Sequence, residues 1–363
     1  MKHPPPQLSV IIPVLSETET LSALLKNLAA QQGLNFEIII VDGNSLAADP
    51  HHQEEFTTRF DLPIQYLQSE PGRGKQMNRG AGKAATPFLL FLHADTSLDD
   101  TLLLKEALQT FQQAEKATPD TPLAGHFGLR FSLPATANAA AYYFYESKTY
   151  LNRLDCINGD QGMMISRIFF NRLDGFDESL RYMEDIRLAR KIFLTGRWIT
   201  LPGCLTTSSR RFTSEGLAER QTLNALLKNF DTIGFHSFFR TAEDAYRSQK
   251  ETGRLQLAPF LRLIHREVRE QGVRAAVGLW YKTGRYVADN AWQLAFSLDC
   301  RRSFREGLPA NTGPGQWLRR YEKWIAPFLT SKLGGGLTAL ATFIWFYGLL
   351  TKLTLIHSGS DDD

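Results

Sequence analysis

The chain has 363 residues, of which 43% are hydrophobic and 22% are charged, so it has enough apolar material for a sizeable core and for about two domains. Its net charge of +3 excludes a strong overall attraction to nucleic acid, although a local basic region remains compatible with it. The three cysteines, Cys156, Cys204 and Cys300, are far apart and form no CxxC pair, which favours a reducing compartment over a disulfide framework. The first residues lack the long apolar core of a signal peptide, so we expect the N-terminal part to be cytoplasmic.

Short apolar segments alternate with helical patterns in the first part of the chain. We expect strands at residues 8–13, 37–42, 64–67 and 88–93. Helices are predicted after the first strand, where Ser16 and Glu19 form a capping box, and over residues 101–116. This alternation predicts an α/β fold with a mostly parallel sheet flanked by helices, whose continuously apolar strands are covered on both faces.

The pattern is looser in the rest of the chain. Strands are predicted at 124–131 and 162–166, and helices at 138–154 and 183–194. Residues 251–360 contain fifteen Lys or Arg against seven Asp or Glu, so the composition changes at about residue 250. We therefore predict a catalytic domain at 1–250 and a mainly helical extension at 251–363.

Polar residues follow each of the first four predicted strands. Glu17 follows the first strand, Asp42 ends the second, the segment 72–75 (GRGK) follows the third, and His93 and Asp95 lie at the end of the fourth. Ligands of α/β sheets bind at the carboxyl ends of the strands. We therefore expect these residues to lie close to one ligand site.

Two of these segments are suited to a nucleotide. The Asp42 carboxylate can accept hydrogen bonds from a base or ribose, or it can serve as an ordinary turn aspartate. In GRGK the glycines permit close approach of a phosphate, while Arg73, Lys75 and the following helix N-terminus supply positive charge. The segment is neither a P-loop nor a dinucleotide fingerprint, and a basic surface turn is the alternative.

Three further groups are candidates for chemistry. Asp95, with a metal ion, can bind a diphosphate, whereas His93 is either a ligand or a core histidine. Glu184 and Asp185 begin a helix, so one can complement the helix dipole and the other can act as a base, unless both are merely solvated. Arg210 and Arg211, after a run of hydroxyl residues, suit phosphate or carboxylate contacts or form a basic loop.

Taken in order, these segments resemble the family 2 glycosyltransferases of the GT-A fold. The resemblance covers about residues 8–215 and includes LSVIIPVLSETETL, IIIVDGNS, GRGKQMNRGAG, FLLFLHAD, GDQGMMISR with GFDESL, and MEDIRLARK. SSRRF and LHADT look like a bacterial subgroup that is sometimes linked to arsenosugar pathways.

The resemblance implies roles for individual residues. Asp185 corresponds to the catalytic base, with Glu184 beside it, and Asp160 falls on the acceptor side of the cleft. Asp95 corresponds to the metal-binding last Asp of the family's D-x-D, whereas His93 replaces the first Asp and leaves the ligand role of that position open. Together with the candidates above, the full set of predicted ligand-binding residues is Pro13, Glu17, Asp42, Arg73, Asn78, Asp160, Arg210 and Arg211.

The function predicted is that of an inverting, metal-dependent glycosyltransferase. Asp185 would deprotonate a hydroxyl acceptor, and Mg²⁺ or Mn²⁺ on Asp95, with Arg73 nearby, would stabilise the departing nucleoside diphosphate. One alternative is a sugar-phosphate nucleotidyltransferase, although the segment 13–17 (PVLSE) lacks the glycine-rich, basic signature of that class. A catalytically inactive nucleotide-sugar-binding protein is another, which the His93 departure keeps open.

A charge-free segment near the C-terminus suggests a membrane association. Residues 333–351 contain no charged side chain and are bracketed by Lys332 and Lys352. Their length is in the lower part of the roughly 17–25 residues that span a bilayer. Basic residues precede the segment and three aspartates follow it, which favours a catalytic domain on the cytoplasmic face of the membrane. An acceptor near the membrane, such as a lipid, would suit this location. A buried helix of a cytoplasmic protein and a helix lying in the interface are the alternatives.

Overall fold

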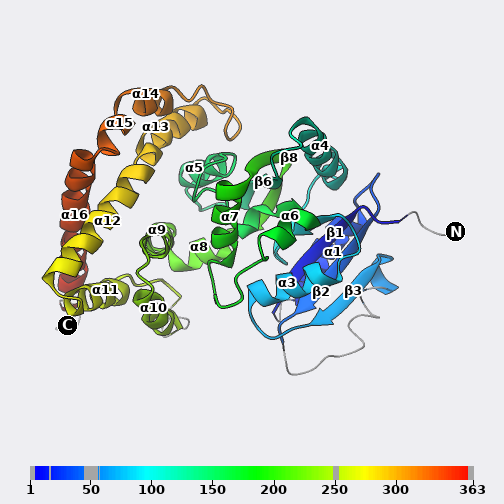
Figure 1. Ribbon diagram of the computed structural model, residues 1–363, viewed down its shortest axis with the longest axis horizontal. Coiled ribbons are helices and arrows are strands. Elements are labelled where there is room, and N and C mark those ends of the chain that lie inside the picture. Colours follow the sequence, from blue (N-terminus) through cyan, green and yellow to red (C-terminus); the bar gives the residue numbers. More distant parts are fainter. Residues whose placement is uncertain (1–4, 16–17, 45–55, 57, 248–252, 359–363) are drawn as a thin grey trace. The chain divides into compact units, whose positions relative to one another are not determined.

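The computed structural model describes residues 5–15, 18–44, 56, 58–247 and 253–358. The chain divides into two compact units, Met1–Ser208 and Ser209–Asp363. The first unit is a mixed α/β fold and the second is helical (Figure 1).

Over the described residues, the first unit is built on one eight-stranded sheet with the order β3-β2-β1-β4-β7-β6-β8-β5. β1 to β4 pair with one another in parallel, as the sequence predicts. The other half is mixed, because β7 runs antiparallel to β4 and β6, whereas β6 and β8 are parallel. The strands are β1 (Leu8–Val14), β2 (Phe36–Asp42), β3 (Ile64–Gln68), β4 (Phe88–Phe91), β5 (Thr96–Ser97), β6 (Leu123–Ser132), β7 (Met163–Ser166) and β8 (Arg197–Ser208).

Helices flank this sheet, as predicted for an α/β fold. α3 packs on β1 and β2, α7 packs on β8, and α4 packs on β8 and β6. The helices of the first unit whose bounds are described are α1 (Thr18–Ala29), α3 (Arg73–Lys83), α4 (Leu103–Ala117), α5 (Ala139–Thr149), α6 (Arg167–Arg172) and α7 (Glu184–Thr195), with a 3₁₀ turn, η1 (Gly159–Gln161).

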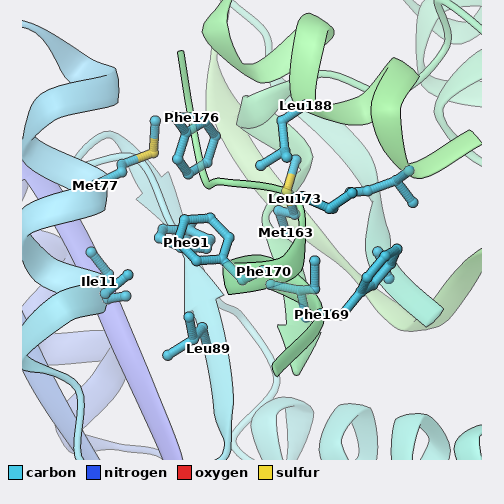
Figure 2. Packing of buried hydrophobic residues seen from close by; sticks show 14 of the residues in the cluster. Ile11, Met77, Leu89, Phe91, Met163, Phe169, Phe170, Leu173, Phe176 and Leu188 are labelled. Carbon is cyan, nitrogen blue, oxygen red and sulfur yellow. The ribbon is translucent and has the colours of Figure 1, made fainter. Parts of the chain in front are cut away.

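The central strands form because their sequences are continuously apolar and rich in β-branched residues. All seven residues of β1 and the first six of β2 are buried. On one face, Ile11 packs in a large cluster with Met77 of α3, Phe91 of β4 and the aromatic residues that follow β7 (Figure 2). A Cβ on Gly80 would lie 2.5 Å from Ile11 Cγ2, so this glycine lets α3 approach β1 closely.

β8 was not predicted from the sequence. It contains Pro202 and Gly203, which are typical of strand ends and bulges, and the φ of Gly203 is 76°. Its register with β6 shifts between His126 and Gly128. The strand therefore forms through pairing with β6, and its local sequence gives little sign of it.

Two predicted elements end earlier than expected. β4 ends at Phe91, because the chain turns directly after it and Thr96 N donates to His93 O (3.2 Å). α5 ends at Thr149, where Leu151 N donates to Lys148 O (3.1 Å) in a following turn. His93 therefore lies in a turn at the end of the strand.

The second unit is helical, as predicted, but it begins near residue 209, whereas the predicted boundary is residue 250. The reason is that Phe230 of α9 and Phe238 of α10 pack in one apolar cluster with Leu261 and Ile264 of α11. Its helices are α8 (Arg210–Glu215), α9 (Leu217–Ile233), α10 (Ser237–Arg247), α11 (Ala258–Glu270), α12 (Val273–Asn290), α13 (Trp292–Arg305), α14 (Gln316–Trp324), α15 (Ala326–Leu329) and α16 (Lys332–Ser358).

Candidate active site

Arg73, the first residue of α3, lies within electrostatic reach of four carboxylates. Its Nε is 3.5 Å from Oε1 of Glu184. Burial by itself would lower the pKa of Arg73, but the charges of Glu184, Asp185, Asp95 and Asp160 outweigh it and raise that pKa above its ordinary value. The fold therefore brings together five predicted site residues from four separate segments. We call them the arginine–carboxylate cluster.

Glu184 is the buried member of this cluster. It is 1% exposed, whereas the side chain of Arg73 is 43% exposed. Burial and the neighbouring charge of Asp185 raise the pKa of Glu184, and the charge of Arg73 opposes this shift. Glu184 is therefore the buried partner of Arg73 in an ion pair.

Asp185 is held by two backbone donors. Gly159 N donates to Oδ2 (2.6 Å) and Ile186 N donates to Oδ1 (2.8 Å). An ionised carboxylate has about four acceptor positions, so two hydrogen bonds leave it able to accept a proton. The side chain is half-buried, and its orientation is fixed by the turn η1 and by its own helix.

Gly159 was not identified from the sequence, where the GDQ segment drew attention to Asp160. A Cβ on Gly159 would lie 2.9 Å from His93 Nε2 and 3.0 Å from Asp185 Oδ2, so both side chains pack against this glycine. A small pocket opens here. It is lined by Met77, Phe91, His93, Gly159, Met163, Phe176 and Asp185.

Asp95 is exposed in the turn after β4, and His93 beside it is half-buried. Among the described residues, no group of three or more His, Cys, Asp or Glu is arranged to hold a metal ion. Mg²⁺, however, is often held by one or two carboxylates together with the phosphates of a substrate. Asp95 is an exposed carboxylate within electrostatic reach of Arg73, so it fits a site in which the protein and the substrate phosphates hold the ion together.

Asp42 ends β2, and the structure holds its carboxylate in place. Tyr66 Oη donates to Oδ2 (2.8 Å) and Asn44 N donates to Oδ1 (2.8 Å). Burial, the hydrogen bond to Asp42 and the charge of Asp42 all raise the pKa of Tyr66, so its hydroxyl remains a donor. Tyr66 was not identified from the sequence. The parallel register pairs Asp42 with Gln68, and Tyr66, two residues before Gln68, lies on the same face of β3 as Gln68.

Gln76 was also missed from the sequence. Its Nε2 donates to the carbonyl oxygens of Val14 (2.7 Å) and Val41 (2.8 Å), and the side chain is buried. A Cβ on Gly43 would lie 3.0 Å from Gln76 Cδ, which leaves little room for another residue there. Gln76 therefore joins the carboxyl ends of β1 and β2 where Asp42 is presented.

Two residues of the GRGKQMN segment have partners within the protein. Asn78 Nδ2 donates to Phe176 O (2.9 Å), and its Oδ1 accepts from Phe176 N (2.9 Å), so its amide holds the GFDES turn. Lys75 Nζ donates to Oε2 of Glu70 (2.6 Å) in an exposed pair. A donor contact by Asn78 stays a prediction.

The remaining predicted residues lie in different places. Pro13 is buried within β1 opposite Val41, and Glu17 lies outside the described residues. Arg210 and Arg211 are exposed at the start of α8, in the second unit. Their roles in donor binding stay predictions.

Residues 9–174 match Glycosyl transferase family 2. The match covers most of the first unit and a little under half of the chain. PGL/p-HBAD biosynthesis glycosyltransferases of Mycobacterium bovis and Mycobacterium tuberculosis are 35% identical to this chain over 94 residues, which is 26% of this chain and 37% of theirs. A dolichol-phosphate mannosyltransferase of Pyrococcus furiosus is 30% identical over 90 residues, or 24% of this chain and 26% of that protein.

The chain therefore spans only about a third of the length of the mycobacterial relatives that it matches. A crystal structure of S. aureus TarS 1-349 in complex with UDP is 19% identical, with a TM-score of 0.49 over 83% of this chain and 92% of that one. This likeness is too distant to assign any residue. The family 2 match supports a glycosyltransferase domain in the first unit, whose mixed sheet with flanking helices is consistent with the GT-A fold.

Proposed function

We propose that the first unit is an inverting glycosyltransferase, which moves a sugar from a nucleoside-diphosphate sugar to a hydroxyl acceptor. The observation that best supports this proposal is the arginine–carboxylate cluster, where Arg73 lies within reach of Asp185 and Asp95. The cluster belongs to a unit that matches family 2 over residues 9–174.

In this mechanism Asp185 is the general base. The acceptor oxygen attacks the anomeric carbon of the sugar while its proton passes to the Asp185 carboxylate, which Gly159 N and Ile186 N hold in position. The bond between the anomeric carbon and the diphosphate oxygen breaks, and the electron pair leaves with the nucleoside diphosphate. Arg73 and the N-terminus of α3 offer positive charge for that leaving group.

We further propose that the donor binds together with Mg²⁺ or Mn²⁺. Asp95 would hold the ion jointly with the donor phosphates, and His93 lies two residues away. When bound, the ion would supply Lewis-acid charge for the leaving diphosphate. We expect His93→Ala to be less harmful than Asp95→Ala, because histidine replaces the aspartate usual at this position of the family.

The proposed location is the cytoplasmic face of a membrane, with attachment through the C-terminal region. Among the described residues, α16 is the one helix long and apolar enough to cross a bilayer by length and composition. A lipid-linked acceptor would suit this location. The link to arsenosugar pathways stays a prediction, because the comparisons do not bear on it.

The proposal is tested by measuring the binding and hydrolysis of a panel of nucleotide sugars by the full chain, with Mg²⁺, with Mn²⁺ and with excess chelator. We expect metal-dependent hydrolysis of at least one donor, its loss in Asp95→Ala, and wild-type behaviour in the control Asp120→Ala, which alters an exposed turn after α4. Full activity in chelator would overturn the metal assignment. Release of pyrophosphate from a nucleoside triphosphate would indicate a nucleotidyltransferase, and binding without turnover would indicate an inactive binding protein.

A further inference from the structure

α16 is apolar around its whole circumference, yet it is only partly covered by the protein. The most apolar 18-residue window of its segment Lys332–Leu355 has a mean hydropathy of 1.5, and only 17% of that window is buried. Length and composition alone would allow it to span a bilayer. The contacts of its two faces indicate another arrangement.

One face of α16 packs along α12. Thr338 Oγ1 donates to Gly284 O (2.9 Å), and the backbone of Ala339 lies against Gly284 so closely that a side chain there would clash. Further along, the ring centroids of Trp280 and Phe346 are 5.1 Å apart, and Phe346 is 2% exposed. α16 is therefore an integral helix of the second unit.

The opposite face of α16 is exposed and aliphatic. Leu333, Leu337, Leu340 and Ile344 are between 50% and 68% exposed. Their spacing of four, three and four residues places them on one face of the helix. We call this face the apolar strip. A continuous exposed apolar surface of this kind marks an interaction site.

The segment that contains the strip has a strong excess of positive charge. Residues 316–358 include one acidic residue, Glu322, and five basic ones. Two of the basic side chains lie over indole rings, with Arg320 5.2 Å from the ring centroid of Trp317 and Lys323 4.9 Å from that of Trp324. The basic residues are all exposed: Arg319, Arg320, Lys323, Lys332 and Lys352.

Basic side chains and tryptophans in the same segment as an aliphatic face are complementary to an anionic lipid surface, with acyl chains below and phosphate groups above. α12, which packs along α16, argues against a span. It bears Arg274, Lys282 and Asp289 on exposed positions, and charged groups at the bilayer centre are strongly unfavourable. A crossing α16 would either draw these charges into the hydrocarbon or lose its packing on α12.

We propose that the second unit docks on an anionic membrane surface through the apolar strip, with α16 lying in the plane of the interface. This inference rests on the proposed membrane attachment and is independent of the chemistry of the first unit. The bilayer is the occupant that the charges favour, because a second copy of the chain would bring another basic segment against this one.

The test is sedimentation of the full chain with phosphatidylcholine vesicles, with and without phosphatidylglycerol. We expect binding that depends on phosphatidylglycerol, decreases with salt, and is released by alkaline carbonate. Leu340→Glu with Ile344→Glu should weaken binding at least about tenfold, because it places charge on the buried side of the interface. Removing Arg319, Arg320 and Lys323 should weaken it by about fivefold for each charge lost.

The matched control is Ile168→Glu with Leu194→Glu, two residues of the first unit that are 84% and 85% exposed. It should bind vesicles like the wild type, and circular dichroism should show that both double variants are folded. Binding that resists carbonate would establish a span and overturn the in-plane arrangement, while leaving the membrane attachment intact. If the full chain did not bind vesicles, or if the control variant lost binding as much as the strip variant, both the in-plane arrangement and the membrane attachment would be overturned. Light scattering could instead show a dimer that is lost only in the strip variant, with no binding to vesicles. The apolar strip would then be covered by a second copy of the chain.

Discussion

The two units distribute their apolar and charged residues in opposite ways. In the first unit every residue of β1 is buried, and charged residues converge on Arg73. In the second unit aliphatic residues such as Leu333 and Ile344 are more than half exposed, and the surrounding charges are basic and spread over the surface. Converging charges with shifted pKa values are typical of chemistry, whereas an exposed apolar face is typical of docking.

This contrast predicts that the two properties can be lost independently. Substitutions in the arginine–carboxylate cluster should change catalysis and leave vesicle binding intact, while substitutions in the apolar strip should do the reverse. A variant of either group that changes both properties would show that the contrast is wrong.

The largest effect is expected for Asp185→Asn, which keeps the size of the side chain and removes its ability to accept a proton. Loss of a general base typically costs about 10²–10⁴-fold in rate, so we expect transfer to decrease by that factor, with donor affinity and vesicle binding unchanged. Steady-state kinetics and calorimetry measure the two quantities, and Asp120→Asn is the exposed control. Retention of most of the transfer rate would show that Asp185 is not the base.

Gly159→Ala tests whether the position of Asp185 matters as well as its charge. The new Cβ would lie 2.9 Å from His93 Nε2 and 3.0 Å from Asp185 Oδ2, so one of these side chains must move. A displacement of about 1 Å can cost roughly 10²-fold in rate, so we expect kcat to fall by up to that factor with little change in Tm.

The matched control for this substitution is Gly82→Ala on α3, where the added Cβ would meet nothing within 4 Å. It should keep full activity and gain about 0.5–1 kcal/mol in free energy of unfolding, because alanine favours the helix. Equal kinetics of the two variants would remove Gly159 from the site.

Arg73→Ala and Lys75→Ala compare two cations of the same turn. Arg73 lies in the carboxylate cluster, whereas Lys75 pairs with Glu70 outside it. We expect Arg73→Ala to raise the Kd for a nucleoside diphosphate about tenfold, or about 1.4 kcal/mol, and Lys75→Ala to change it less than about twofold. Calorimetry measures both constants. If the two substitutions changed the Kd equally, Arg73 would have no particular role in binding, and the turn would be an ordinary solvated basic loop.

The smallest expected effect concerns the pH dependence of stability. The pKa of Glu184 is raised above its ordinary value of 4.5, mainly by burial, so its contribution to stability is fully present below that value and is lost as pH rises through the folded-state pKa. Glu184→Gln cannot ionise, so its Tm relative to the wild type should increase from pH 4 to pH 8.

Glu70→Gln is the control of opposite sign. The hydrogen bond from Lys75, together with its charge, lowers the pKa of Glu70, whose contribution is present above its ordinary pKa and is lost as pH falls. The Tm of Glu70→Gln relative to the wild type should therefore decrease slightly over the same rise in pH. Calorimetry across this range measures both trends, and slopes of the same sign would contradict the assigned electrostatics.

The sequence alone was sufficient to predict the parallel half of the sheet. Buried parallel strands are continuously apolar, so β1 and β2 can be recognised without knowing what covers them. Arg73 and Asp95 could be predicted because polar groups at the carboxyl ends of such strands converge on one edge. Glu184 and Asp185 were candidates as acids at the start of a helix, and Asp160 came only from the family resemblance. β8 could not be predicted, because its Pro202 and Gly203 are tolerated only through pairing with β6.

Contacts between distant segments were decided by the tertiary structure. Gly159 donates a hydrogen bond to Asp185, 26 positions away, and Tyr66 donates one to Asp42, 24 positions away. No local sequence pattern predicts either contact. The same holds for the last helix. Composition determined that α16 is long and apolar on every side, but an apolar surface is attracted equally to a protein core and to a lipid. Only the packing of Ala339 and Phe346 against α12 decided which face is used within the protein and which remains exposed.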